Sequence, residues 1–208
     1  MDHFFPYLVA GALGLGLAAS SGFRVFVPLL AASVAHRVGW LPSSPGFEWL
    51  GSTPALLVLG TATVAELLGY YLPVVDHLLD TLTTPASVVA GALLMTSSLT
   101  HLDPALRWTL GVVVGGGAAG LVQGSTALLR AGSTATTGGL ANPLLATLEN
   151  LLAVVGSVIA LVLPLLAAGL VIGLLVLVMS RGRRWQQRRA ARRAQIVQLK
   201  APIPPGLA

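Results

Sequence analysis

Three charged residues, Arg24, Glu66 and Glu149, lie inside stretches that otherwise have the composition of membrane-spanning helices. A charge near the middle of a bilayer costs a few kcal/mol on insertion scales. Such residues usually face the interior of a helix bundle or a water-filled cavity, and there they mark a functional site. We therefore expect these three residues to face one another or a polar cavity inside the protein.

The composition excludes a soluble domain. Charged residues make up 9% of the 208 residues and hydrophobic residues 55%, whereas soluble domains carry about 25% charged residues. The length suits one bundle of about five spans at about 20 residues each. The predicted fold is all-α, a polytopic transmembrane helical bundle of about five to six spans over residues 1–180. Residues 181–208 form a separate basic tail.

The basic residues are concentrated in that tail. Residues 181–200 contain eight basic and no acidic residues, while the rest of the chain has four basic and seven acidic ones. A basic segment directly after a span favours a cytoplasmic location and contact with anionic lipid headgroups over nucleic-acid binding. Counting five spans back from a cytoplasmic tail places the N-terminus outside. No Lys or Arg precedes the first apolar run, so it is predicted to be a retained span and not a cleaved signal peptide.

Proline dipeptides predict where helices begin. In each, a residue that can cap a helix precedes proline at the first helical position. They are Thr53-Pro54, Thr84-Pro85, Asp103-Pro104 and Asn142-Pro143.

Two apolar regions are too long for one straight span. The first runs from Phe4 to about Val38, with an interruption at Ser20 to Arg24, and is predicted to be either a broken span or a hairpin of two half-helices. The last, from Pro143 to Met179, would be about 55 Å long as one helix. Pro164 should kink or break it, and the segment that begins at Asn142-Pro143 is predicted to be broken or re-entrant.

Glycine spacing marks one helix as a packing surface. Gly111/Gly115 and Gly116/Gly120 give two GxxxG spacings, which let helix backbones approach closely. Packing within the bundle is one interpretation. A hydrated path and a homo-oligomer contact through Gly111–Gly120 are the others.

The segment Gly132 to Pro143 is rich in glycine and hydroxyl residues and leads into a helix start. Free N–H groups and the positive end of the helix dipole at such a start suit an anionic group or a re-entrant turn. A flexible exterior loop is the alternative. Glu149 and Asn150 follow two turns later. The residues predicted to line a solute or ion pathway are Arg24, Glu66, Tyr70, Ser133, Thr134, Thr136, Thr137, Asn142, Glu149 and Asn150.

A buried Arg24 needs a carboxylate, and Glu66 or Glu149 is the predicted partner. The pair could serve transport or only hold the fold together. Tyr70 shares a helix face with Glu66 at i+4. If the two glutamates meet in one low-dielectric cavity, one should hold a proton or a cation.

Asp76 and Asp80 also have i, i+4 spacing, which could hold a metal cation through carboxylate oxygens. An amphipathic surface turn is the alternative. No organic cofactor is predicted.

Several segments together are distinctive: residues 21–28, 102–108 and 132–139, Asn142-Pro143, and residues 146–150. They resemble a bacterial integral membrane family named only as domain of unknown function 4126, over about Leu13 to Leu166. The resemblance implies a multi-pass protein of the bacterial inner membrane and implies no particular activity.

These observations predict a transporter or channel for a small solute or ion, because buried charges and broken helices are typical of such proteins. Lipid handling, by headgroup binding or flipping, is the second interpretation, and a non-catalytic membrane assembly partner is the third. An enzyme is not predicted. The four histidines, His3, His36, His77 and His101, lie outside the predicted span interiors and lack the spacing of a zinc site.

Overall fold

In the computed structural model, residues 4–42, 44–71, 73–177 and 180–181 are described, without the side chains of residues 73, 74 and 76–78. All regular structure in these ranges is helical. The elements are α1 (Phe4–Ser21), α2 (Phe26–Arg37), η1 (Glu48–Gly51), α3 (Thr53–Gly69), α4 (Pro73–Ser98), α5 (Pro104–Leu110), the π-helix η2 (Gly111–Gly116), α6 (Gly117–Thr137) and α7 (Asn142–Val162). An apolar helix Pro164–Leu177 follows. The chain divides into two units, residues 1–172 and 173–208, and the contacts below lie in the first.

Among the described residues, four helices are long and apolar enough to cross a membrane: Phe4–Ser21, Leu79–Ser98, Pro104–Thr137 and Asn142–Val162. Thr53–Gly69 and Pro164–Leu177 are shorter apolar helices. The predicted multi-helix membrane protein is confirmed in this outline. The exact number of spans remains a prediction, and so does the basic tail, of which residues 182–208 lie outside the described ranges.

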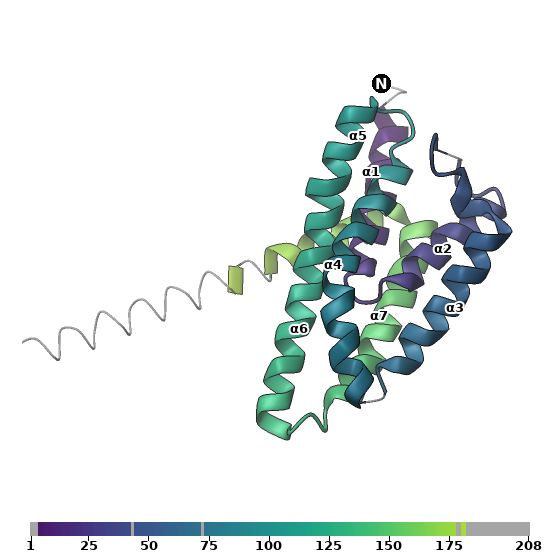
Figure 1. Cartoon of the computed structure of the whole chain (residues 1–208). Helices are drawn as coiled ribbons and strands as arrows, with labels where there is room; N and C mark the ends of the chain where they lie inside the picture. Colours follow the sequence, from purple (N-terminus) through teal and green to yellow (C-terminus); the bar gives the residue numbers. More distant parts are fainter. Residues whose placement is uncertain (1–3, 43, 72, 178–179, 182–208) are drawn as a thin grey trace, which may run out of the picture. The chain divides into compact units, whose positions relative to one another are not determined.

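The predicted break in the first apolar region is confirmed. Helix α1 ends at Ser21 and α2 begins at Phe26, so residues 22–25 connect two helices inside the bundle (Figure 1). Phe5 near the start of α1 lines the same cavity as His36 at the end of α2 and His101 after α4. The start of α1 and the end of α2 therefore lie at the same end of the bundle. Of the two predicted alternatives for this region, a broken span or a hairpin of two half-helices, the structure shows the hairpin.

The proline signals located three of four helix starts. Helix α3 begins at Thr53, with Ser52 as its cap, and α5 begins at Pro104, where Asp103 accepts a hydrogen bond from the Ala105 N–H. Thr84-Pro85 was wrong as a helix start, because Pro85 lies inside α4. The Thr84 hydroxyl donates to the Asp80 carbonyl oxygen. Hydroxyl side chains of this kind help helices in membranes to tolerate proline.

Helix α7 begins at Asn142 and runs without interruption to Val162. The expected separate segment from Pro143 to about Ala153 is thus part of one continuous helix, which ends just before Pro164 as that proline predicted. The Asn142 side chain does not cap it, because its amide donates to the Thr134 hydroxyl, at 3.2 Å.

The glycine-rich helix packs within the chain. A Cβ on Gly115 would lie 2.4 Å from the Gly91 carbonyl oxygen, and one on Gly111 would overlap the Thr96 hydroxyl. The backbones of α4 and η2 are therefore as close as the GxxxG spacing predicts. A homo-oligomer through Gly111–Gly120 remains a prediction.

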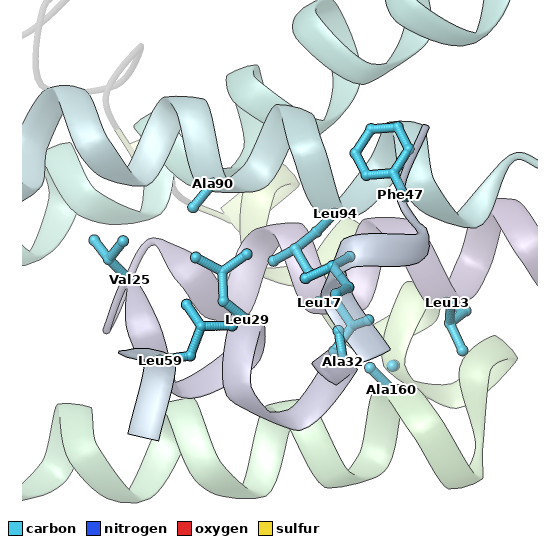
Figure 2. Close-up of a cluster of buried hydrophobic side chains, with 12 residues drawn as sticks. Leu13, Leu17, Val25, Leu29, Ala32, Phe47, Leu59, Ala90, Leu94 and Ala160 are labelled. Carbon is cyan, nitrogen blue, oxygen red and sulfur yellow. The ribbon is translucent and has the colours of Figure 1, made fainter. Parts of the chain in front are cut away.

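Leucine, valine and alanine side chains from several helices form the main hydrophobic core (Figure 2). Leu17 of α1, Leu29 of α2 and Leu94 of α4 are buried together. This core fixes both arms of the α1–α2 hairpin and so positions the break between them.

The hairpin can be tested by labelling, because the chain contains no cysteine. Phe4, Trp40 and Leu140 are all highly exposed, and each can be replaced by cysteine singly. We expect a membrane-impermeant maleimide to label Phe4→Cys and Trp40→Cys from one side and Leu140→Cys from the other. Labelling of the Phe4 and Trp40 positions from opposite sides would mean that the first apolar region crosses the membrane.

Candidate functional site

Arg24 lies at the break between α1 and α2 and is 2% exposed. Its guanidinium donates to Glu149 Oε2 at 2.8 Å and to Asn150 Oδ1 at 2.5 Å. It also donates to the carbonyl oxygens of Phe23 and Ala146, at 2.9 and 3.2 Å. The predicted pairing of Arg24 with a membrane-embedded carboxylate is confirmed, and the partner is Glu149.

A second arginine, Arg130 of α6, shares the same carboxylate. Its Nε donates to Glu149 Oε1 at 3.1 Å and its Nη2 to Glu149 Oε2. Its Nη1 lies 3.4 Å from Asp80 Oδ1 of α4. The side chains of Arg24, Arg130 and Glu149 are 1%, 5% and 8% exposed, and that of Asp80 is 30% exposed. The four groups, called the ion chain below, carry two formal charges of each sign and lead from the protein interior to its rim.

Tyr70 contacts both arginines. The guanidinium carbons of Arg24 and Arg130 lie 3.7 and 4.3 Å from the centre of its ring, within the range of cation–π contacts. The Tyr70 hydroxyl pairs with the Thr83 hydroxyl at 2.9 Å. This tyrosine was predicted at the site from its spacing to Glu66, but it contacts the arginines.

Glu66 of α3 stabilises the helix start that follows the break. Its two oxygens accept hydrogen bonds from the backbone N–H groups of Val25 and Phe26, at 2.8 and 2.9 Å. These are N–H groups at the start of α2, where the helix dipole also favours a negative charge. Glu66 and Glu149 thus have different hydrogen-bond donors, which removes the reason to expect that they share a proton or a cation.

The hydroxyl-rich segment is mostly helical, which corrects the expected loop. Helix α6 continues to Thr137 and ends at Gly138, which has a left-handed φ of 63°. The hydroxyls of Thr136 and Thr137 donate to the carbonyl oxygens of Gly132 and Ser133. These side chains therefore satisfy the backbone of their own helix, and only residues 138–141 connect α6 to α7.

A cavity of about 420 Å³, called cavity B, lies beside the ion chain. Its polar lining is Asp80, Arg130, Thr134 and Asn142. The Asn142 Oδ1 is buried and accepts no hydrogen bond from the described residues. The structure thus brings two of the predicted residues, Thr134 and Asn142, to the rim of the network. It does not place Glu66 in the same lining.

Asn150 links the network to the protein surface on another side. It accepts from Arg24 and donates to the Tyr71 hydroxyl at 3.4 Å. That hydroxyl also pairs with Thr147, at 3.1 Å.

A second cavity of about 380 Å³, called cavity A, lies at the other end of the helices. On α4, Asp80 lines cavity B and Ser97 lines cavity A, a separation of about 26 Å at 1.5 Å per residue. On α7, Asn142 and Leu161 give about 28 Å. The cavities are thus separated by nearly the ~30 Å of a bilayer hydrocarbon core.

The predicted metal pair remains untested as a pair, because the Asp76 side chain lies outside the described part. Asp80 is close to Arg130. Within the described residues, no group of three or more histidine, cysteine or acidic side chains could hold a metal ion.

Sequence reasoning missed two buried arginines. Arg130 is 4% exposed and Arg107 is 7% exposed. Arg107 donates to the Ser44 hydroxyl at 2.8 Å and to the Pro45 carbonyl oxygen at 3.1 Å, and so anchors the segment after α2. The burial cost that singled out Arg24 applies equally to Arg130, which stands within the same kind of apolar helix. The same burial cost did not single out Arg107, because this residue lies near a predicted helix start.

Replacing Glu66 should unfold the start of α2 selectively. Glu66→Ala removes both acceptors and should cost about 1–2 kcal/mol, as the loss of a helix cap does. Glu66→Gln keeps one oxygen and should cost less. Hydrogen exchange at the Val25 and Phe26 amides reports this directly, with exposed Glu48→Ala as the control. Unchanged protection of both amides in Glu66→Ala would contradict the capping role.

Comparison with known proteins places these residues within one family model. The model described as Domain of unknown function (DUF4126) matches residues 12–184. This confirms the resemblance seen in the sequence and extends it beyond Leu166, up to the beginning of the basic tail. No curated protein and no solved structure matched the chain.

Proposed function

The chain belongs to the DUF4126 family, and from the geometry of its own residues we propose that it transports a small solute or ion across the membrane. One observation carries this proposal. Two cavities lie about 26–28 Å apart along the same helices, and a discontinuous helix pair with a buried charge network lies between the two ends. Transporters commonly place their sites at discontinuous helices near the middle of the membrane.

In this proposal the ion chain closes the path at the end near cavity B. Arg130 lines cavity B and also binds Glu149, which binds Arg24 at the helix break. A charged solute that reached Arg130 would compete with Asp80 or Glu149 for its donors. Such competition would loosen the contacts that hold α4, α6 and α7 to the break, and it would link solute binding to a change in helix packing.

Lipid handling is the second candidate, and an apolar groove favours it. The groove, of about 490 Å³, runs between α2, α3 and α7 and includes Leu30, Leu67 and Val158. It could hold an acyl chain beside the helix break. The same arginines would then act on a headgroup phosphate.

The proposed setting is the bacterial inner membrane, with the C-terminal tail in the cytoplasm and in contact with anionic lipids. Arg37 and Arg107 flank the end of the bundle that holds cavity A, so the positive-inside rule places this end in the cytoplasm too. We further propose that the protein is not an enzyme and does not bind nucleic acid.

The transport proposal can be tested in liposomes with a matched pair of substitutions on α6. Ala127 lines cavity B, while the next residue, Leu128, is 76% exposed. Flux of a panel of Na⁺, K⁺, H⁺, chloride and phosphate is measured with ion-sensitive dyes. We expect Ala127→Trp to abolish whichever flux the wild type shows, because the indole fills the path. Leu128→Trp should leave it unchanged, and Glu149→Gln should reduce it.

Gel filtration would first establish that each variant is folded. Full flux through folded Ala127→Trp would contradict a path through cavity B. Lipid scrambling without solute flux would favour the second candidate.

A further inference from the structure

Cavity A has features of a ligand site that transport alone does not require. Its walls come from α1, the end of α2 and the residues after it, the end of α4, and the end of α7. The lining residues include His36, His101, Leu13 and Leu161. Its volume of about 380 Å³ falls within the range of small-molecule sites.

The side chains of α1 that line cavity A become less exposed toward the interior of the bundle. Phe5 is 62% exposed, whereas Leu13 is 7% exposed, and these residues lie about 12 Å apart along α1. The deep part is formed by aliphatic side chains such as Val9, Leu13 and Leu161. The cavity thus resembles a short apolar sleeve that opens at one end of the bundle.

Polar groups are gathered at the open end. His36 and His101 both line the cavity, from elements that are far apart in the sequence. The His101 ring makes an edge contact with Tyr7, with ring centres 5.9 Å apart, which restrains its orientation. Ser97 and Ser98 donate their protons to the Leu94 carbonyl oxygen. The polar groups that remain for a ligand are therefore the His101 imidazole, the Trp40 indole, the Thr100 hydroxyl and the ring nitrogen of His36 that does not bond to the Leu41 backbone.

The side chains that line cavity A favour an acidic headgroup over a cationic one. None of the described residues that line cavity A is a carboxylate, so an ammonium headgroup would find no counter-charge there. An acidic headgroup can form a hydrogen bond with an imidazole whichever of the two holds the proton. The volume is suited to one short chain and not to two.

We propose that cavity A binds a single-chain amphiphile with an acidic headgroup, a carboxylate or a phosphate, with the chain against Leu13 and Leu161 and the headgroup at His36 and His101. The site goes beyond the proposed transport, because it requires binding only. It holds whether or not the ligand crosses the membrane.

Native mass spectrometry of the full-length protein tests the site with four ten-carbon probes: decanoate, decyl phosphate, decanol and decyltrimethylammonium. We expect one saturable adduct per chain for decanoate or decyl phosphate, at least tenfold weaker binding of decanol, and no saturable adduct for the ammonium. The acid that binds more tightly identifies the class of ligand: decanoate indicates a fatty acid, and decyl phosphate indicates a phosphorylated lipid. Saturable binding of decyltrimethylammonium as tight as that of the acids would overturn the proposal. A lack of saturable binding of both acids would also overturn it.

Two sets of variants locate the binding. Ala10→Trp should remove the adduct, because the indole fills the cavity. Leu8→Trp is the control and should leave the adduct intact, because Leu8 is exposed and does not line the cavity. The double variant His36→Leu, His101→Leu leaves the apolar walls in place and should reduce decanoate binding to the level of decanol. Unchanged acid binding in the double variant would overturn the headgroup assignment even if Ala10→Trp did not fold. Loss of flux has no bearing on these outcomes, so this proposal and transport fail separately.

Discussion

The cost of burying the Arg24 guanidinium dominates the architecture of this protein. An isolated charge in a low-dielectric interior costs several kcal/mol, and Arg24 is 2% exposed. Each donor nitrogen of its guanidinium therefore has a partner: Asn150 for Nε, Glu149 and Phe23 for Nη1, and Ala146 for Nη2. These contacts fix the position of the α1–α2 break relative to α7.

The break needs support from two further helices, α3 and α6. Glu66 of α3 satisfies the first N–H groups of α2, Arg130 of α6 shares Glu149, and Tyr70 lies against both guanidinium groups. Backbone that leaves the helical conformation at membrane depth is tolerated only where protein or water satisfies it. The two glutamates thus stabilise the same turn, one through its backbone and the other through its arginine side chain.

Much of this could be predicted from the sequence, because charge in an apolar segment is a strong signal. The charges within apolar segments identified Arg24, Glu66 and Glu149 and the break next to Arg24. Helix starts next to Pro54, Pro104 and Pro143 followed from proline in the first helical turn, although only Asp103 forms the predicted cap. The errors have both local and tertiary causes. Pro85 is accommodated inside α4 without ending it, and the hydroxyls of Thr136 and Thr137 bond to the backbone of their own helix. That the first region doubles back, and that Arg130 joins Glu149, depends on packing between distant segments, which local patterns do not encode.

The central claim is that Arg24 and Glu149 stabilise the fold as a coupled pair. A double-mutant cycle with Arg24→Met and Glu149→Gln tests it through the free energy of unfolding in bicelles. Glu149→Gln should lose about 3–5 kcal/mol, because it leaves Arg24 and Arg130 buried without their shared carboxylate. Arg24→Met should lose less, because Glu149 still pairs with Arg130. The double variant should lose much less than the sum of the two. The control pair, Arg37→Met with Glu149→Gln, should be additive, since Arg37 bonds only to Gly51 and Thr53 among the described contacts. Additive losses for Arg24 and Glu149 would contradict the account.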